Sequence, residues 1–219
     1  MFCGQIISSE IPQLNLQDPV EKALSLMQEH GKVHLPVTDG EKFLGLVSEN
    51  DLLEIGNEKR IEDVADLLLQ VSVRSTDFFS SAVQLSYRYD LDIIPVAGEH
   101  QEYEGSVTRE ELFMLLAKVN GVEEQGSLLV LEMPKNDFAP GQINKLVESN
   151  DAFITHLNTW QDHSLGVMMV QIRINKEEIS DIIATFQRFG YIIRYYHGEE
   201  LYRNELQSNL DNLFNYLNM

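Results

Sequence analysis

The sequence has 219 residues, 43% of them hydrophobic, so it can fill one large or two smaller folded cores. Its formal net charge of −19, from 16 basic and 35 acidic residues, argues against nucleic acid and anionic membrane surfaces as partners, because both are bound through clustered Lys and Arg. No apolar run approaches ~18 residues and no basic leader segment opens the chain, so we expect a cytoplasmic protein without a membrane span.

The first part of the chain predicts the order strand, helix, strand, strand, helix. The elements are an extended segment over 1–17, a helix from Asp18-Pro19 to Gly31, strands over 33–37 and 43–47, and a helix that begins at Ser48. Proline is favoured at the first position of a helix because the N–H that it lacks would have no partner there. We therefore expect Pro19 at that position and Asp18 as the N-cap.

The same order of elements returns about sixty residues later. Gly45-Leu46-Val47-Ser48-Glu49-Asn50-Asp51 has the variant Gly105-Ser106-Val107-Thr108-Arg109-Glu110-Glu111, and Leu35-Pro36-Val37 has the variant Ile94-Pro95-Val96. The offset is 59 at the prolines and 60 at the glycines, so the second copy has one extra residue between its strands. Matches at such regular offsets indicate an internal duplication.

The second copy continues the pattern of the first. Its expected elements are a helix over 61–69, a strand over 71–75, a helix over 77–89, strands over 93–96 and 103–107, and a helix over 110–118. In both copies the strand around the proline is a run of apolar residues, which is typical of a strand buried on both faces. We expect Leu35 and Val37, with Ile94 and Val96, to face the core between the copies.

A polar stretch over 123–126 separates the duplication from a region with a different pattern. This region predicts strands over 128–133, 152–159, 167–174 and 191–196 and helices over 141–148 and 176–189, which is a ferredoxin-like order. The last segment, 198–219, predicts an amphipathic helix, which packs either on its own domain or on a second subunit. Its apolar stripe consists of Tyr202, Leu206, Leu210, Leu213 and Leu217.

The duplicated part, residues 1–122, resembles a tandem pair of CBS (cystathionine-β-synthase) domains, called a Bateman module, with repeats over about 1–58 and 59–122. The resemblance rests on the strand around the proline and on the Gly-x-x-Ser/Thr-x-x-acid pattern, which both occur twice. Residues 126–197 resemble an ACT domain through Asp137-Phe138-Ala139-Pro140-Gly141, which has one residue more than the family's Asp-x-Pro-Gly turn. A CBS pair followed by an ACT domain is the arrangement of acetoin-utilisation-type proteins. These resemblances imply an α+β fold.

The pairs Ser48-x-x-Asp51 and Thr108-x-x-Glu111 allow two interpretations. Each fits a capping box, in which the hydroxyl accepts a hydrogen bond from the third helical amide and the carboxylate reaches back to the N-cap amide. Each also places free N–H groups and the positive end of a helix dipole where an anion can bind. In CBS domains that bind adenine nucleotides, the hydroxyl meets phosphate and the carboxylate meets ribose hydroxyls.

The resemblance implies a regulatory ligand, such as AMP, ADP, ATP or S-adenosylmethionine, between the repeats. The residues that it assigns to the site are Ser48, Asp51, His34 and Pro36 from repeat one and Thr108, Arg109, Glu111 and Pro95 from repeat two. Asp51 matches the family's ribose ligand, whereas Glu111 departs from it and is the better capping residue. Arg109 is either a cation for phosphate or a solvated helix residue, and His34 is a residue of the pocket rim rather than a catalytic base.

No motif of catalysis or metal binding is present in the sequence. The six histidines lack metal-ligand spacing, and the single cysteine, Cys3, excludes an internal disulfide and a multi-thiolate metal site. Walker, dinucleotide-binding and Gly-x-Ser-x-Gly motifs are absent as well. Gly141 is either the glycine at which the ACT family's amino-acid ligand approaches the backbone or a residue favoured at a strand-to-helix turn. We expect a non-enzymatic sensor with no cofactor and no metal.

The expected partners are a small-molecule nucleotide and a second copy of the chain, because CBS pairs and ACT domains commonly form homodimers. The alternative is a structural or protein-interaction module. In that case the nucleotide site is vestigial, both Ser/Thr-x-x-acid motifs serve only as helix caps, and the acidic surface meets a basic protein partner.

Overall fold

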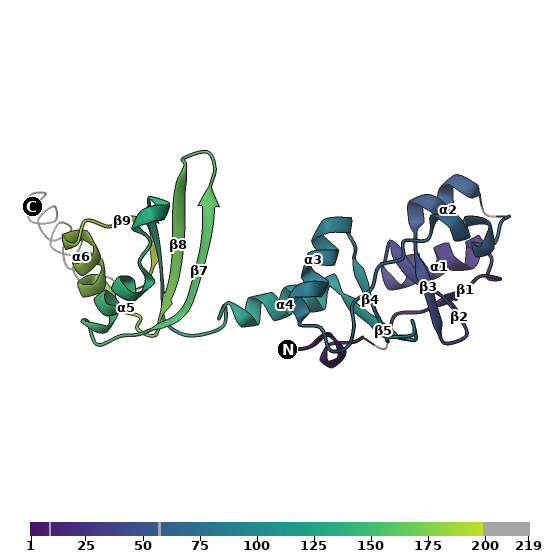
Figure 1. Cartoon of the computed structure of the whole chain (residues 1–219), viewed down its shortest axis with the longest axis horizontal. Helices are drawn as coiled ribbons and strands as arrows, with labels where there is room; N and C mark the ends of the chain where they lie inside the picture. Colours follow the sequence, from purple (N-terminus) through teal and green to yellow (C-terminus); the bar gives the residue numbers. More distant parts are fainter. Residues whose placement is uncertain (9, 57, 199–219) are drawn as a thin grey trace, which may run out of the picture. The chain divides into compact units, whose positions relative to one another are not determined.

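A computed structural model describes residues 1–8, 10–56 and 58–198 of the chain, which has an α+β fold in two compact units (Figure 1). The first unit comprises Met1–Leu116 and the second begins at Ala117. This division falls inside helix α4 (Arg109–Val119), ahead of the polar stretch at which the sequence indicates a boundary. Within the described ranges, no helix is long and apolar enough to cross a bilayer.

The first repeat has the expected order of elements. Its strands are β1 (Leu14–Asn15), β2 (His34–Asp39) and β3 (Lys42–Ser48), and its helices are α1 (Val20–His30) and α2 (Glu49–Ile55). The expected capping of α1 is wrong, because Pro19 is the N-cap and Asp18 is not. The Asp18 carboxylate instead accepts a hydrogen bond from the Asn15 amide at 2.9 Å and pairs with Lys22 at 2.8 Å. It therefore closes the turn that precedes the helix.

The second repeat reproduces the strand register of the first. It consists of a 3₁₀ helix η2 (Ile61–Leu67), helix α3 (Phe79–Tyr89), strands β4 (Ile93–Ala97) and β5 (Tyr103–Thr108), and helix α4. Pro36 pairs with Leu46 and Pro95 with Ser106, and both hairpins have a register shift one residue further on. Two expected elements differ: the helix over 61–69 is 3₁₀, and the strand over 71–75 is a single parallel bridge between Val73 and Val96.

Each hairpin is extended by a segment that precedes the other repeat. Leu46 of β3 forms an antiparallel bridge with Leu69, which leads into repeat two, and Ser106 of β5 forms one with Ser8. The segment 1–8, which we call the N-terminal arm, therefore joins the hairpin of the second repeat rather than that of the first. Sequence order assigned it to the first repeat.

These crossing segments explain the glycine that begins each repeated motif. Gly45 and Gly105 have φ angles of +155° and +136°, a region that residues with a Cβ rarely adopt. A Cβ at Gly45 would collide with Leu68, and one at Gly105 would collide with Ile7. The glycines thus allow the backbone of the crossing segment to approach the hairpin.

The N-terminal arm is part of the hydrophobic core of the second repeat. Cys3 in the 3₁₀ helix η1 (Cys3–Gln5) has no exposed surface and packs in a cluster with Val73, Ala82 and Ile94. Its amide donates to the Asp77 carbonyl at 2.8 Å. Burial, together with the charge of Asp77, raises the pKa of the Cys3 thiol, so this cysteine is held in its unreactive protonated form.

The core between the repeats is made by a different set of residues from the expected one. Leu35 and Val37 pack in the core of repeat one, and Ile94 and Val96 pack in that of repeat two. Side chains two apart along a strand share a face, and in both repeats this face is turned toward the repeat's own helices. The cluster that joins the repeats consists of Phe43, Leu46, Leu91, Ile93 and Ala97, and the Phe43 ring also stacks on Tyr103 at 6.1 Å between centroids.

The second unit is a four-stranded antiparallel sheet with two helices, in the ferredoxin-like order (Figure 1). Its elements are β6 (Ser127–Met133), the 3₁₀ helix η3 (Lys135–Asp137), α5 (Pro140–Glu148), β7 (Ile154–Asp162), β8 (Val167–Ile174), α6 (Ser180–Arg188) and β9 (Ile192–His197). The strand order is β7-β8-β6-β9. The predicted helix over 198–219 lies, from residue 199 onward, outside the described residues.

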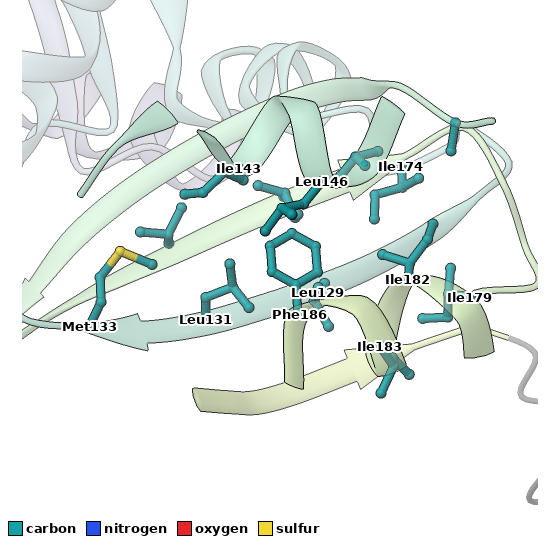
Figure 2. Packing of buried hydrophobic residues seen from close by; sticks show 14 residues of the cluster. Leu129, Leu131, Met133, Ile143, Leu146, Ile174, Ile179, Ile182, Ile183 and Phe186 are labelled. Carbon is teal, nitrogen blue, oxygen red and sulfur yellow. The ribbon is translucent and has the colours of Figure 1, made fainter. Parts of the chain in front are cut away.

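Both helices of this unit pack against the sheet through one apolar cluster (Figure 2). Leu129 and Leu131 from β6, Ile143 from α5 and Phe186 from α6 are all fully buried in it. The Phe186 and Tyr191 rings form a T-shaped pair, with 5.3 Å between centroids. This cluster is the core of the second unit.

Candidate functional site

The two Ser/Thr-x-x-acid turns differ in how fully they cap their helices. In repeat two, the Thr108 amide donates to Glu111 Oε2 at 2.8 Å and the Glu111 amide donates to Thr108 Oγ1 at 3.2 Å. In repeat one, the Asp51 amide donates to Ser48 Oγ at 3.2 Å, and Ser48 Oγ donates to Asp51 Oδ2 at 2.6 Å. The shorter Asp51 side chain thus bonds the hydroxyl rather than the N-cap amide. The capping-box interpretation is confirmed in full for repeat two only.

Three polar contacts join the repeats near these turns. Asp92 Oδ1 lies 2.6 Å from His34 Nδ1, and Asp92 Oδ2 accepts a hydrogen bond from the Val33 amide at 2.8 Å. Lys32 pairs with Glu110 at 2.7 Å. The start of strand β2 is thereby tied to the second repeat through two side chains that both carry negative charge.

The sequence patterns did not indicate a role for Asp92. By the offset of 59, Asp92 occupies the position of Val33, so a carboxylate stands where the first copy has an apolar residue. This mismatch between the two copies is the feature of the sequence that could have identified Asp92 as a functional residue. Its partner could not be identified from the sequence, because the contact is made across the two repeats.

The Asp92 carboxylate gives the contact between the repeats a defined pH dependence. Burial alone raises the pKa of Asp92, but the hydrogen bonds from His34 and from the Val33 amide outweigh it and hold the pKa below its ordinary value. A carboxyl whose pKa is lowered by folding stabilises the folded state above its unfolded pKa of about 3.9. That stabilisation is lost as the pH falls through the lower, folded pKa.

We expect Asp92→Asn to lower the free energy of unfolding at pH 7 by about 1.5–3 kcal/mol, the range for hydrogen bonds to a charged group. The difference from the parent should shrink as the pH falls below about 3.9, because the unfolded carboxyl is then protonated and the folded one follows at its lower pKa. Urea unfolding of the parent and the variant at pH 7 and at pH 3 measures this difference in stability. Asp90→Asn is the control, since its exposed carboxylate should contribute no more than about 1 kcal/mol. A difference for Asp92→Asn that stays constant between pH 7 and pH 3 would contradict the assignment.

A hollow of about 310 Å³ opens between the repeats beside the first turn. Its walls come from both repeats: Val33, His34, Ser48, Glu49 and Asn50 from the first, and Tyr89 and Asp90 from the second. His34 and Ser48 are directly opposite each other on β2 and β3, which is why the fold brings them together. We call this hollow the inter-repeat pocket.

The other predicted site residues do not line the inter-repeat pocket. Pro36 and Pro95 are buried inside their strands. Thr108 and Glu111 are joined to each other by the capping bonds, and Asp51 is hydrogen-bonded to Ser48. Of the eight residues predicted for the nucleotide site, His34 and Ser48 line this pocket, and both belong to repeat one.

Arg109 lies against the end of helix α3. Its Nε donates to the Leu91 carbonyl at 3.0 Å and its Nη2 donates to Asp90 Oδ1 at 2.8 Å. It lines a separate, largely apolar hollow of about 440 Å³ between α3 and α4, together with Tyr87 and Phe113. A cation at a helix C-terminus complements the helix dipole, so packing and capping account for Arg109 in this position.

Gly141, the candidate residue of the second unit, is the second residue of helix α5. An added Cβ would meet no atom within 4 Å, so local packing does not require a glycine there. A hollow of about 400 Å³ lies nearby, lined in part by Asp137, Gln142 and Tyr191. Gly141 is not one of its lining residues.

Residues 3–58 match the family model of the CBS domain. An inosine-5'-monophosphate dehydrogenase from Korarchaeum cryptofilum is 30% identical over 109 residues, which are 49% of this chain and 22% of that protein. A homoserine O-acetyltransferase from Methanobrevibacter ruminantium is 24% identical over 119 residues, which are 51% of this chain and 23% of that protein. This chain thus spans less than a quarter of the length of either relative. A solved CBS domain pair/ACT domain protein from Thermotoga maritima has a TM-score of 0.49 and 20% identity, covering 54% of this chain and 98% of that one.

Proposed function

We propose that this protein is a non-enzymatic regulatory sensor, which binds an adenine nucleotide or derivative in the inter-repeat pocket of a CBS pair. The observation that carries the proposal is that the pocket has walls from both repeats and contains Ser48. Ser48 and Asp51 lie within the segment that matches the CBS domain model, and we propose for them the phosphate and ribose contacts that the resemblance implies. A volume of about 310 Å³ is at the lower end of the range for small-molecule pockets.

The proposed mechanism is a change in how the repeats contact each other. A ligand can shift this contact only by as much as it binds one arrangement better than the other. The contacts of Asp92 with His34 and Val33 lie at the edge of the pocket, so a bound ligand alters the surroundings of this link directly. The ACT-like second unit and a homodimeric assembly, as in acetoin-utilisation-type proteins, are the parts through which the signal would be passed on.

A thermal-shift panel with AMP, ADP, ATP, S-adenosylmethionine and amino acids tests the proposal. A ligand present at 100 times its dissociation constant should add about 2.7 kcal/mol to the stability of the folded protein. If no adenine compound stabilises the protein, the alternative of a structural or protein-interaction module with a vestigial site is favoured. The complete capping box of Thr108 and Glu111 already fits that alternative for repeat two.

The two acidic residues of the repeated motif should respond differently to truncation. Asp51→Ala should weaken adenine-ligand binding by about 1.5–3 kcal/mol, because it removes a charged acceptor for the ribose hydroxyls. Glu111→Ala should leave binding nearly unchanged and lower the stability by about 0.5–2 kcal/mol through the lost helix cap. Calorimetric titration and urea unfolding of both variants separate the two effects. Parent-like ligand binding by Asp51→Ala would remove the role that we give to this carboxylate.

Homodimerisation is supported by an exposed apolar surface on the helices of repeat two. Tyr87 on α3 and Phe113 on α4 are each more than 60% exposed and line the same hollow between these helices. Large apolar side chains gathered on one surface are typical of contact sites between proteins. Measurement of the molecular mass by light scattering tests the assembly, and a monomer across the micromolar range would refute it.

A further inference from the structure

We infer that the inter-repeat pocket selects an adenosine derivative without phosphate, whose 5' substituent is neutral or positively charged. The inference rests on the proposed function, since it concerns the ligand of the same pocket. It follows from the charges that surround the pocket and from the partners to which the nearby cations are already bound.

Negative charge dominates the walls of the pocket. Glu49 and Asp90 line it from opposite repeats. Asp51 is hydrogen-bonded to Ser48, and Asp92 is bonded to His34, so two more carboxylates are in contact with lining residues. Among the described residues that form the lining, none is Lys or Arg.

Two cations next to the pocket lining, Arg109 and Lys32, are held by other groups. Arg109 is bound to Asp90 and to the Leu91 carbonyl. Lys32 is bound to Glu110, and its side chain is only 10% exposed. Its hydrogen bond holds the pKa of Glu110 below its ordinary value, so this partner stays ionised near neutral pH. A phosphate placed in the pocket would therefore face Glu49 on one wall and, on the other, an Asp90 carboxylate that already engages Arg109.

The same lining offers suitable partners for a nucleoside. The Asp51 carboxylate, which is bonded to the lining residue Ser48, is the acceptor that we propose for the ribose hydroxyls, and the Asn50 side chain carries both a donor and an acceptor for a base edge. The Tyr89 ring, 41% exposed, offers a flat apolar surface for stacking. A neutral thioether at the 5' carbon avoids repulsion by Glu49 and Asp90, and a sulfonium or amino group there is attracted by them.

Calorimetric titration of the full chain with 5'-methylthioadenosine and with AMP tests this selectivity. We expect 5'-methylthioadenosine to bind at least roughly tenfold more tightly than AMP at low salt, because like charges placed together weaken binding strongly. The ratio of the two affinities should decrease when the salt concentration is raised, because salt screens the repulsion between the AMP phosphate and the carboxylates of this open pocket. AMP binding as tightly as 5'-methylthioadenosine would overturn the inference while leaving the proposed function standing.

Two charge-removing variants identify the residues responsible. Glu49→Gln and Asp90→Asn should each tighten AMP binding about threefold to tenfold and change 5'-methylthioadenosine binding less than about twofold. Glu54→Gln is the matched control. Glu54 is an exposed carboxylate on α2, the helix that also carries Glu49, but it lies outside the pocket lining, so its substitution should change the affinity for neither ligand. If the ratio of the affinities for 5'-methylthioadenosine and AMP is unchanged in both pocket variants, the inference is contradicted. Failure of every adenine compound to bind the parent would instead refute the proposed function, and this inference with it.

Discussion

Deletion of the N-terminal arm, residues 1–8, should destabilise the second repeat rather than the first. The arm supplies fully buried Cys3, partly buried Ile6 and Ile7, and the backbone bridge between Ser8 and Ser106. Burying one apolar side chain contributes about 1.5–3 kcal/mol, so the deletion should lower the free energy of unfolding by about 3 kcal/mol or more. The loss should be greatest in strands β4 and β5, which the arm covers.

Hydrogen exchange measured segment by segment distinguishes this expectation from the one based on sequence order. Amides of β4 and β5 should lose protection to a greater extent than those of β2 and β3. Phe2→Ala is the control, because this side chain is half exposed and its truncation should lower stability by less than about 1 kcal/mol. Selective loss of protection in β2 and β3 would show that the arm belongs to repeat one.

The second large effect is expected at Phe186, in the centre of the core of the second unit (Figure 2). Phe186→Ala should lower the free energy of unfolding of this unit by about 3–5 kcal/mol, because it leaves a cavity among side chains from the sheet and both helices. The ring also loses its edge contact with Tyr191. Trp160, the single tryptophan of the sequence, lies on β7 of the same unit and reports its unfolding by fluorescence.

Phe189 is a matched control for Phe186. It is the same residue type three positions further along the chain, at the end of α6, and it is 54% exposed. Phe189→Ala should therefore lower the free energy of unfolding by less than about 1 kcal/mol, apart from its contact with Arg188. Equal effects of the two substitutions would mean that α6 does not pack on the sheet through Phe186.

Most of the secondary structure could be predicted from the sequence, because it depends on local patterns. The helix α6 was signalled by its apolar spacing and by Gly190, and β8 was predicted with the bounds that it has in the structure. Capping was predicted in the same way: Thr108 and Glu111 form both expected bonds, whereas Asp18 is not the N-cap expected for α1. Elements with weak local signals differed most, as the 3₁₀ helix over Ile61–Leu67 shows.

The sequence did not predict which segments meet across the two repeats. The arm packs on repeat two, and Leu35 faces the helices of its own repeat rather than the other repeat. The sequence could not predict the second point, because a strand that is apolar on both faces does not show which face turns toward which partner. The same applies to the site. Ser48 and His34 were identified from motif and position, whereas the contributions of Asp90, Asp92 and Tyr89 depend on tertiary contacts between distant residues.

The exchange of outer segments between the repeats also affects the order in which they are completed during translation. Leu69, which extends the first hairpin, is synthesised soon after Leu46, whereas Ser8 must wait for Ser106, roughly a hundred residues later. At about 5–20 residues per second this delay lasts about 5–20 s. The arm therefore leaves the ribosome long before its binding surface exists, and its isoleucines are open to chaperones in that interval. The first repeat can close while the second is still being made, so the direction of synthesis sets the sequence of assembly.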